Sequence, residues 1–95
     1  MKKKKKPYRL FTLGNLVATP SVLKAVPGAE LTTALMRHLR GDWGDVSDES
    51  RASNDRAVKG GDRISSVYHS EGGVKFWIIT ERDRSATTIL LPNEY

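Results

Sequence analysis

The stretch Val74-Lys-Phe-Trp-Ile-Ile-Thr80 decides the fold of this 95-residue chain. Successive side chains of a β-strand point to opposite faces, so Phe76 and Ile78 share one face while Trp77 and Ile79 share the other. A strand that is apolar on both faces is typical of the centre of a sheet. We therefore predict a central strand over residues 74–80, covered on each face by helices and loops or by a second subunit.

Two further strands are predicted beside this one. Residues 63–70 alternate between two faces and run into Glu71-Gly72-Gly73, which is typical of a β-hairpin loop. Residues 85–91 are rich in β-branched side chains, and Pro92 ends that segment. The order of these elements predicts a C-terminal three-stranded antiparallel β-meander.

The N-terminal half predicts one strand and two helices. Residues 9–18 are typical of a strand with a bulge or turn near Gly14. Thr19-Pro20 is a helix-start signal, and this helix is short because Pro27 disfavours helical geometry at the residue before it. Residues 29–40 carry one apolar stripe and precede Gly41, which predicts a helix with a left-handed C-terminal cap.

A third helix is predicted between Ser47, its N-cap, and Gly60-Gly61. It has few large apolar side chains, so we expect Trp43 in the preceding loop to cover it. The predicted fold class is α+β, with an N-terminal strand and two or three short helices packed on the C-terminal meander. Residues 9–95 are expected to form a single domain, since the chain has the length of one.

Residues 1–8 form a basic tail. Its lysines account for the whole net charge of +5, because the other 16 − 5 = 11 Lys and Arg face 11 Asp and Glu. A run of like charges is typically flexible and solvated. The alternative is a sequence-independent contact with nucleic acid, for which five lysines predict a log–log salt slope of roughly −4 to −5 on duplex DNA. These lysines are Lys2, Lys3, Lys4, Lys5 and Lys6.

The composition excludes several classes of protein. The chain has no cysteine, so it has no disulfide framework, thiolate nucleophile or cysteine-ligated zinc site. No apolar run has the length of a signal peptide core or of a membrane span. We therefore expect a cytoplasmic protein with no membrane partner.

The turn Glu81-Arg82-Asp83-Arg84 is the best candidate site in the sequence. It is either a solvated hairpin, in which Asp83 accepts hydrogen bonds from the turn backbone and the arginines pair with carboxylates, or a recognition surface. In the second case Arg82 and Arg84 bind a carboxylate or phosphate of a partner. The sequence leaves both interpretations open.

Other polar groups favour structural roles. His38 borders the apolar stripe in the last turn of its helix and has no second His or Cys nearby. The acidic residues between 42 and 49 lack the spacing of an EF-hand loop. We expect no metal and no cofactor. These acidic residues are Asp42, Asp45, Asp48 and Glu49.

A ribonuclease is an alternative class, because the predicted element order is similar to that of the RelE/ParE-like toxins. Those enzymes use scattered basic and tyrosine groups, for which Arg63, Arg82 and Arg84 are candidates here together with Tyr68 and His69. However, Tyr68 and His69 are neighbours on one strand and point to opposite faces, so we do not expect both to line one pocket. The neutral domain also disfavours an RNA-cleaving surface.

Four segments resemble a family of small bacterial proteins that look like products of plasmids and other mobile elements, with names such as "plasmid-related protein". The match covers roughly residues 12–95 and is most specific in the last twenty; the lysine tail and Ser50 depart from the pattern. The resemblance implies a genomic setting more than a chemistry. The segments are Gly41-Asp-Trp-Gly-Asp45, Ala52-x-Asn54-Asp55-x-Ala57, Ser66-x-Tyr68 and Trp77-Ile-Ile-Thr-Glu81-x-Asp83-Arg-Ser85-x-Thr87-Thr-Ile-Leu-x-Pro92-x-Glu94-Tyr95.

Within these segments, Asn54 and Asp55 are interpreted as polar groups that bond loop backbone, and Trp43 as either a lid on the third helix or an interface anchor. We expect a non-enzymatic interaction protein of mobile-element origin that binds a protein partner, for example as an inhibitor of a restriction or CRISPR nuclease. A ribonuclease toxin and a nucleic-acid accessory factor that uses the tail are the alternatives. A homodimer is compatible with the sequence.

Overall fold

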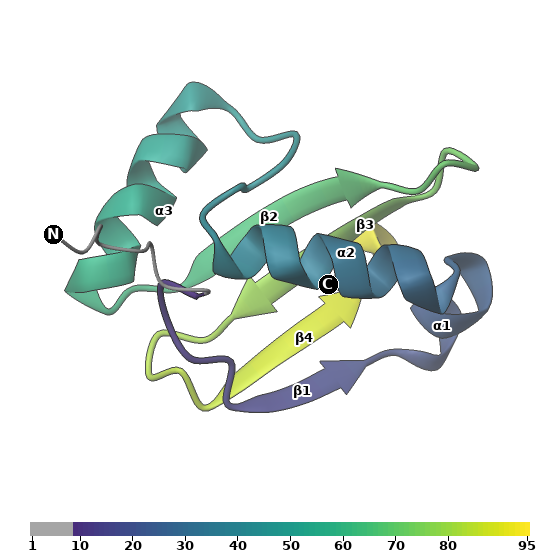
Figure 1. Cartoon of the computed structure of the whole chain (residues 1–95), viewed down its shortest axis with the longest axis horizontal. Coiled ribbons are helices and arrows are strands. Elements are labelled where there is room, and N and C mark those ends of the chain that lie inside the picture. The colour runs from purple at the N-terminus through teal and green to yellow at the C-terminus, as the bar shows by residue number, and fades with distance from the viewer. Residues whose placement is uncertain (1–8) are drawn as a thin grey trace, which may run out of the picture.

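The computed structural model describes residues 9–95, and the predicted basic tail with its five lysines lies outside the described residues. The fold is α+β, with three helices, a four-stranded sheet and a closing 3-10 turn (Figure 1). The fold class is therefore confirmed. In chain order the elements are β1 (Asn15–Ala18), α1 (Pro20–Ala25), α2 (Gly28–Leu39), α3 (Asp48–Gly60), β2 (Ile64–His69), β3 (Lys75–Thr80), β4 (Ala86–Leu90) and η1 (Pro92–Glu94).

The sheet has the strand order β1-β4-β3-β2. As predicted, β3 is a central strand and pairs antiparallel with both β2 and β4. The predicted C-terminal antiparallel meander is thus present as β2, β3 and β4, but the sheet has four strands rather than three, because β1 joins it parallel to β4. A parallel partner requires a long crossover. The pairing of Asn15 with Ala86 therefore leaves no local signal in the sequence.

The first strand is shorter than the predicted residues 9–18, and the break falls at Gly14. Gly14 has φ +64°, and a Cβ there would lie 2.3 Å from the carbonyl oxygen of Arg84. Only glycine fits this close approach to the β3–β4 turn. The chain before it packs elsewhere: the Leu10 N–H donates to the Leu39 carbonyl at 2.8 Å, and Phe11 is buried.

The helix ends follow the sequence signals closely. The hydroxyl of Thr19 accepts from the Val22 N–H at 3.2 Å at the start of α1. Ser47 likewise accepts from the Ser50 N–H at 3.1 Å at the start of α3. Gly41 and Gly61 take the left-handed conformation after α2 and α3, with φ +84° and +79°. Side-chain caps and glycine together set where each helix begins and ends.

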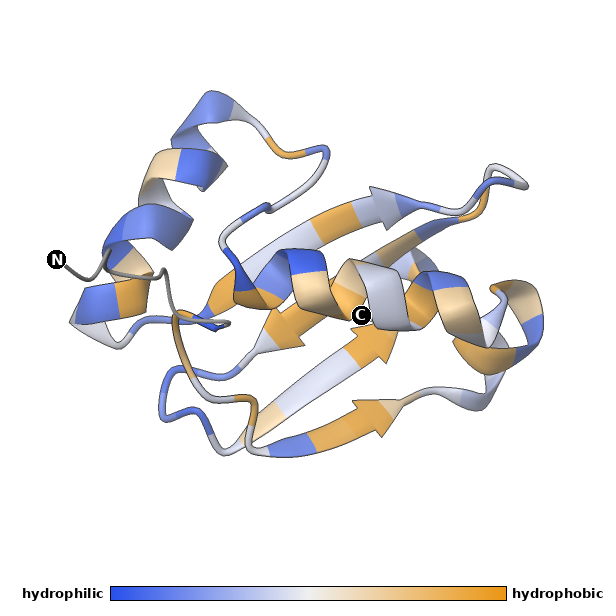
Figure 2. Ribbon diagram, in the orientation of Figure 1, coloured by the Kyte–Doolittle hydropathy of each residue, from blue (hydrophilic) through white to orange (hydrophobic). Residues whose placement is uncertain are grey.

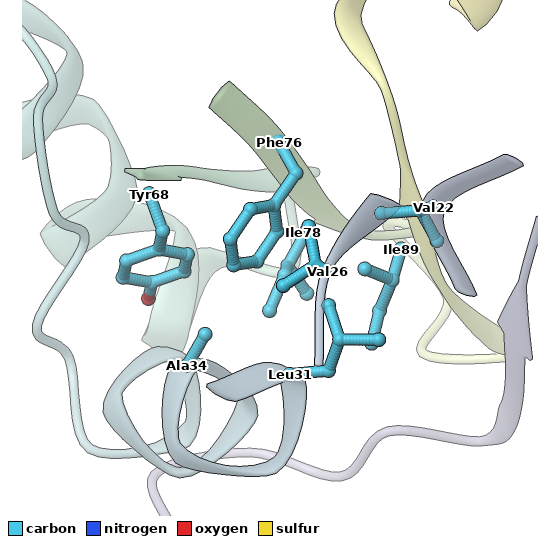
Figure 3. Close-up of a cluster of buried hydrophobic side chains, with 8 residues drawn as sticks. All are labelled: Val22, Val26, Leu31, Ala34, Tyr68, Phe76, Ile78 and Ile89. Atoms are coloured by element: carbon cyan, nitrogen blue, oxygen red, sulfur yellow. The ribbon is translucent and has the colours of Figure 1, made fainter. Parts of the chain in front are cut away.

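The main core lies between α1 and α2 and one face of the sheet. Leu31 and Ala34 of α2 pack with Phe76 and Ile78 of β3 (Figure 3). We call this the helix-covered face; Figure 1 shows α2 crossing it. Each buried side chain of this kind contributes about 1.5–3 kcal/mol to folding. The buried cluster is Val22, Val26, Leu31, Ala34, Tyr68, Phe76, Ile78 and Ile89.

A second, smaller core holds α3 against the sheet. Figure 2 shows that α3 is mostly hydrophilic, so it has little to bury on its own. Trp43 is only 3% exposed and packs in one cluster with Ala57 of α3 and with Ile64 of β2. The predicted role of Trp43 as a cover for the third helix is confirmed. Phe11 completes the cluster and stacks on the Trp43 ring with centroids 6.2 Å apart.

The outer edge of β2 is covered by two segments distant in sequence. The Asn54 side chain donates to the Ser65 carbonyl at 2.8 Å and accepts from the Ser65 N–H at 3.2 Å. Two residues further along, Val67 donates to the Trp43 carbonyl at 3.0 Å and accepts from the Asp45 N–H at 2.8 Å. The backbone of this edge strand is therefore paired at both positions.

Candidate binding groove

Arg84 of the predicted site is used inside the fold. Its guanidinium donates to the carbonyls of Asp62 and Ala57, each at 2.6 Å, and to that of Glu81 at 3.0 Å. It also lies over the Phe11 ring at 5.6 Å. Ala57 is near the end of α3, where a cation interacts favourably with the helix dipole; its carbonyl also accepts from the Gly61 N–H at 3.0 Å. Arg84 thus fastens the β3–β4 turn to α3, and its φ of +61° is held by these contacts.

The other charged residues of the turn either bond the backbone of the turn or lie near oppositely charged side chains outside it. Asp83 accepts from the Ser85 N–H at 2.9 Å, forming the predicted Asx-type turn, and hydrogen bonds from Ser85 lower the pKa of this carboxyl. Arg82 is 78% exposed and lies 3.9 Å from Asp62. Glu81 pairs with Arg63 at 3.5 Å. Arg82 and Asp83 are the exposed charged residues of the turn, and Glu81 is half-buried.

Trp43, Asn54 and Asp55 form a structural unit away from Arg82. The Trp43 indole donates to Asp55 Oδ1 at 2.9 Å, and Asn54 bonds the β2 edge as described above. The prediction that these polar groups bond loop backbone is wrong in detail, since Asn54 bonds strand backbone and Asp55 an indole. Trp43 and Arg84 both contact Phe11, but they meet in the interior rather than in a cleft.

The candidate ribonuclease groups are distributed over several surfaces. The Tyr68 hydroxyl donates to the Asp42 carbonyl at 2.7 Å, and burial raises the pKa of Tyr68 to about 12. His69 is exposed and lies 3.9 Å from Asp45. Tyr68 and His69 nevertheless border one hollow of about 260 Å³ together with Arg37. The prediction that they would not share a pocket is wrong, because this hollow lies at the end of β2.

His38 lies at the centre of a buried hydrogen-bond chain. It is fully buried, with Nδ1 2.5 Å from Ser66 Oγ and Nε2 2.9 Å from Thr80 Oγ1. Thr80 Oγ1 in turn lies 2.8 Å from Thr87 Oγ1, which donates to the Leu13 carbonyl at 2.9 Å. This series of hydrogen bonds joins α2 to β2, β3 and β4 on the helix-covered face of the sheet.

The donor and acceptor roles along this series of hydrogen bonds fix the tautomer of His38. Thr87 gives its one hydroxyl proton to Leu13, so Thr80 must donate to Thr87 and can only accept from His38. His38 therefore carries its proton on Nε2, and Nδ1 accepts from Ser66. Burial, with a smaller effect of the Arg84 charge, lowers the pKa of His38 to about 3. The ring is neutral, with both nitrogens satisfied, which fits a structural role.

The acidic residues between α2 and α3 also have partners. Asp42 pairs with Arg37 at 2.7 Å, and this contact lowers the pKa of the carboxyl. Asp48 and Glu49 occupy the first turn of α3, as expected for acidic residues at a helix N-terminus. Residues 9–95 contain no cluster of His, Asp and Glu with the arrangement of a metal site.

A groove that the sequence analysis did not identify lies between the start of α3 and the sheet. It has a volume of about 350 Å³ and is floored by β2 and β3 residues that point away from α2. Register places Val67 opposite Trp77, and Ser65 opposite Ile79, on this face. The sequence did indicate that this face is apolar, because the predicted central strand over residues 74–80 carries apolar side chains on both faces. We expected its second face to be covered. The lining residues are Val46, Ser50, Ser53, Asn54, Arg63, Ser65, Ser66, Val67, Trp77, Ile79 and Tyr95.

The groove combines an aromatic wall with polar groups. The rings of Trp77 and Tyr95 pack edge to face with centroids 5.3 Å apart, and Arg63 lies over the Tyr95 ring at 5.2 Å and bonds its hydroxyl. Among the buried side-chain nitrogens and oxygens of residues 9–95, the Trp77 indole Nε1 is the one atom without a hydrogen-bond partner. An unpaired buried donor costs about 1–3 kcal/mol.

Comparison with protein-family models, with curated proteins and with solved structures gives no match to this chain. Within residues 9–95, no helix combines the length and the apolar character that crossing a bilayer demands.

Proposed function

We propose that this protein is a non-enzymatic binding module of mobile-element origin, and that it receives a segment of a partner protein in the groove between α3 and the sheet. The observation that carries the proposal is the groove itself. Its floor is aromatic and aliphatic, Arg63 and two serines of α3 stand at its sides, and Trp77 has an unpaired indole N–H. An apolar centre with a polar rim is typical of a protein interface.

The chemistry of the lining defines the segment that fits. Trp77 and Tyr95 offer aromatic surface to a large apolar side chain, as the anchors of interfaces do. Arg63 is 45% exposed and pairs with Glu81 only at 3.5 Å, so it can bind a second carboxylate. The expected occupant is an acidic segment with one large apolar side chain.

The arrangement of the titratable groups favours binding over catalysis. Arg84 is held by three backbone carbonyls, His38 is buried and neutral, and the Tyr68 hydroxyl is bonded inside the fold. General acid–base chemistry requires groups within hydrogen-bond reach of a substrate. In the setting that the resemblance implies, the proposed partner is a host-defence nuclease of restriction or CRISPR type, which the protein inhibits.

The test fills the groove without disturbing the core. Ser53 is exposed on α3 and lines the groove together with Arg63, so Ser53→Glu places a longer side chain there that repels an acidic segment, and it also improves helix propensity. Thr32→Glu adds the same charge to an exposed position on α2 and is the matched control. We expect wild type and Thr32→Glu to retain the same host protein from lysate, and Ser53→Glu to retain at least about tenfold less, a loss of roughly 1.4 kcal/mol.

The functional arm measures the transformation efficiency of unmodified plasmid DNA in a restricting host. Wild type and Thr32→Glu should raise it, while Ser53→Glu should not. Equal retention and equal effect for all three proteins would exclude the groove as the binding site. Failure of wild type to retain any protein would overturn the proposed function as a whole.

A further inference from the structure

β1 presents an edge of unpaired backbone groups. The Asn15 N–H donates to the Ser85 carbonyl at 2.9 Å and the Thr19 N–H to the Ile89 carbonyl at 3.1 Å. Because backbone groups alternate in direction along a strand, residues 15, 17 and 19 face β4. Leu16 and Ala18 therefore direct their N–H and C=O groups away from the sheet. Figure 1 shows β1 as the outermost strand, with no element beyond it.

The side chains at this edge are apolar and uncharged. Leu16 is 52% exposed and Val17 48% exposed, and β1 has no charged residue; Figure 2 shows it mainly as a hydrophobic strand. Exposed edges are commonly protected by charged side chains, proline or a bulge. Four of the six large hydrophobic side chains exposed in residues 9–95 lie between residues 10 and 23. They are Leu10, Leu16, Val17 and Leu23.

We propose that β1 pairs antiparallel with β1 of a second copy of this chain, joining the two sheets into one of eight strands. The two-fold axis passes beside Val17, so that Leu16 of each copy lies opposite Ala18 of the other. Each of these residues offers one donor and one acceptor, and the pair forms four backbone hydrogen bonds. A two-fold contact of this kind closes on itself and leaves no further edge at β1.

A second copy fits this edge because the strand is complementary to itself. Leu16 and Ala18 are two residues apart, so the same spacing read in the opposite direction matches donor to acceptor at both positions. The register also keeps every side chain on its own face, with Leu16 and Ala18 on one side and Val17 against Val17 on the other. Since β1 is uncharged, two copies meet without repulsion between facing side chains.

The register gives a test with single cysteines, which is clean because the chain has none of its own. Val17 forms a non-hydrogen-bonded pair with its copy, in which Cα atoms lie about 4.5 Å apart, inside the range that a disulfide spans. Asn15 lies opposite Thr19, so two copies of residue 15 are about 13 Å apart. In the full chain, Val17→Cys should form a covalent dimer under mild oxidation, at least about tenfold faster than Asn15→Cys or the exposed α2 variant Met36→Cys.

A second variant separates association from the chemistry of thiols. Val17→Lys places two ammonium groups opposite each other, so this protein should sediment as a monomer at concentrations where wild type is dimeric, with an unchanged circular dichroism spectrum. A wild type that sediments as a monomer at every concentration up to about 1 mM overturns the proposal. Equal cross-linking at positions 15, 17 and 36 overturns the register. Neither result bears on the groove, which lies on the β2 side of the sheet.

Discussion

The two edges of the sheet differ in whether their outward backbone groups have hydrogen-bond partners. At the β2 edge, Ser65 is bonded by the Asn54 side chain and Val67 by the loop before α3. At the β1 edge, Leu16 and Ala18 have no such cover, and the side chains there are apolar. One edge is covered by the chain's own segments, and the other is available to a partner.

The comparison of the two edges also gives a structural role to two segments of the sequence, residues 41–45 and residues 52–57. Gly44 has φ +76°, and a Cβ there would lie 2.0 Å from the Val67 carbonyl oxygen. The loop at residues 41–45 can therefore approach β2 only with glycine at this position. Asn54 and Asp55 hold α3 beside the same edge, the first through Ser65 and the second through Trp43. Two of the four segments thus have structural roles at the covered edge.

The largest effect is expected when the cover of the β2 edge is removed. Asn54→Leu keeps the side chain near its original size but leaves the N–H and C=O of Ser65 without partners. An unpaired group costs about 1–3 kcal/mol when it is fully buried, and Ser65 is only half-buried, so we expect the two lost bonds to lower the free energy of unfolding by roughly 2–4 kcal/mol. Urea unfolding followed by circular dichroism measures this change.

The control for Asn54→Leu is Arg56→Ala, an exposed substitution two residues along α3 that should change stability by less than about 0.5 kcal/mol. Asn54→Asp is an intermediate case, because it keeps the acceptor for the Ser65 N–H and loses the donor to the carbonyl. Equal stability of wild type and Asn54→Leu would show that the β2 edge does not depend on this cover.

A smaller effect is expected from the titration of His38, which ties β2, β3 and β4 to α2 but does not reach β1. Its pKa is lowered to about 3 in the folded protein, from 6.5. Between these values the unfolded chain binds a proton that the folded chain does not, so stability falls as pH decreases. The slope is about 1.4 kcal/mol per pH unit below pH 6.

The measurement is the free energy of unfolding between pH 4.8 and pH 6, above the range where the carboxylates of Asp42, Asp83 and Glu94, whose pKa values are also lowered, contribute. His38→Asn should lose this slope. In the folded wild type, the ring protons of His38 should show no NMR titration above pH 4.5. A titration near pH 6.5 would contradict the buried neutral ring.

Local patterns in the sequence predicted what local chemistry determines. The caps at Thr19 and Ser47, the glycines after α2 and α3, and the central position of β3 all follow from short-range signals. The parallel pairing of β1 with β4 was missed because the two strands are separated by most of the chain. Arg84 was assigned to a surface because a turn arginine has no sequence signal for the carbonyls of α3 that it bonds.

The groove is a second feature that the sequence predicted only in part. The sequence required cover for Trp77 and Ile79, but it did not place α3 beside them to make a groove of about 350 Å³. The contact of Tyr95 with Trp77 depends on the path of the turn at Pro92–Glu94, and no hydrophobic periodicity in the sequence predicts that path.

Amide hydrogen exchange tests the contrast between the two edges most directly. At a concentration low enough for a monomer, the amides of Ser65 and Val67 should exchange slowly, whereas those of Leu16 and Ala18 should exchange at least about a hundredfold faster. The amides of Asn15 and Thr19, which donate to β4, provide the reference within the same segment. Raising the concentration should slow Leu16 and Ala18 alone. Equal protection at both edges in the dilute protein, or no change with concentration, would contradict a covered β2 edge and a β1 edge that pairs with a second copy.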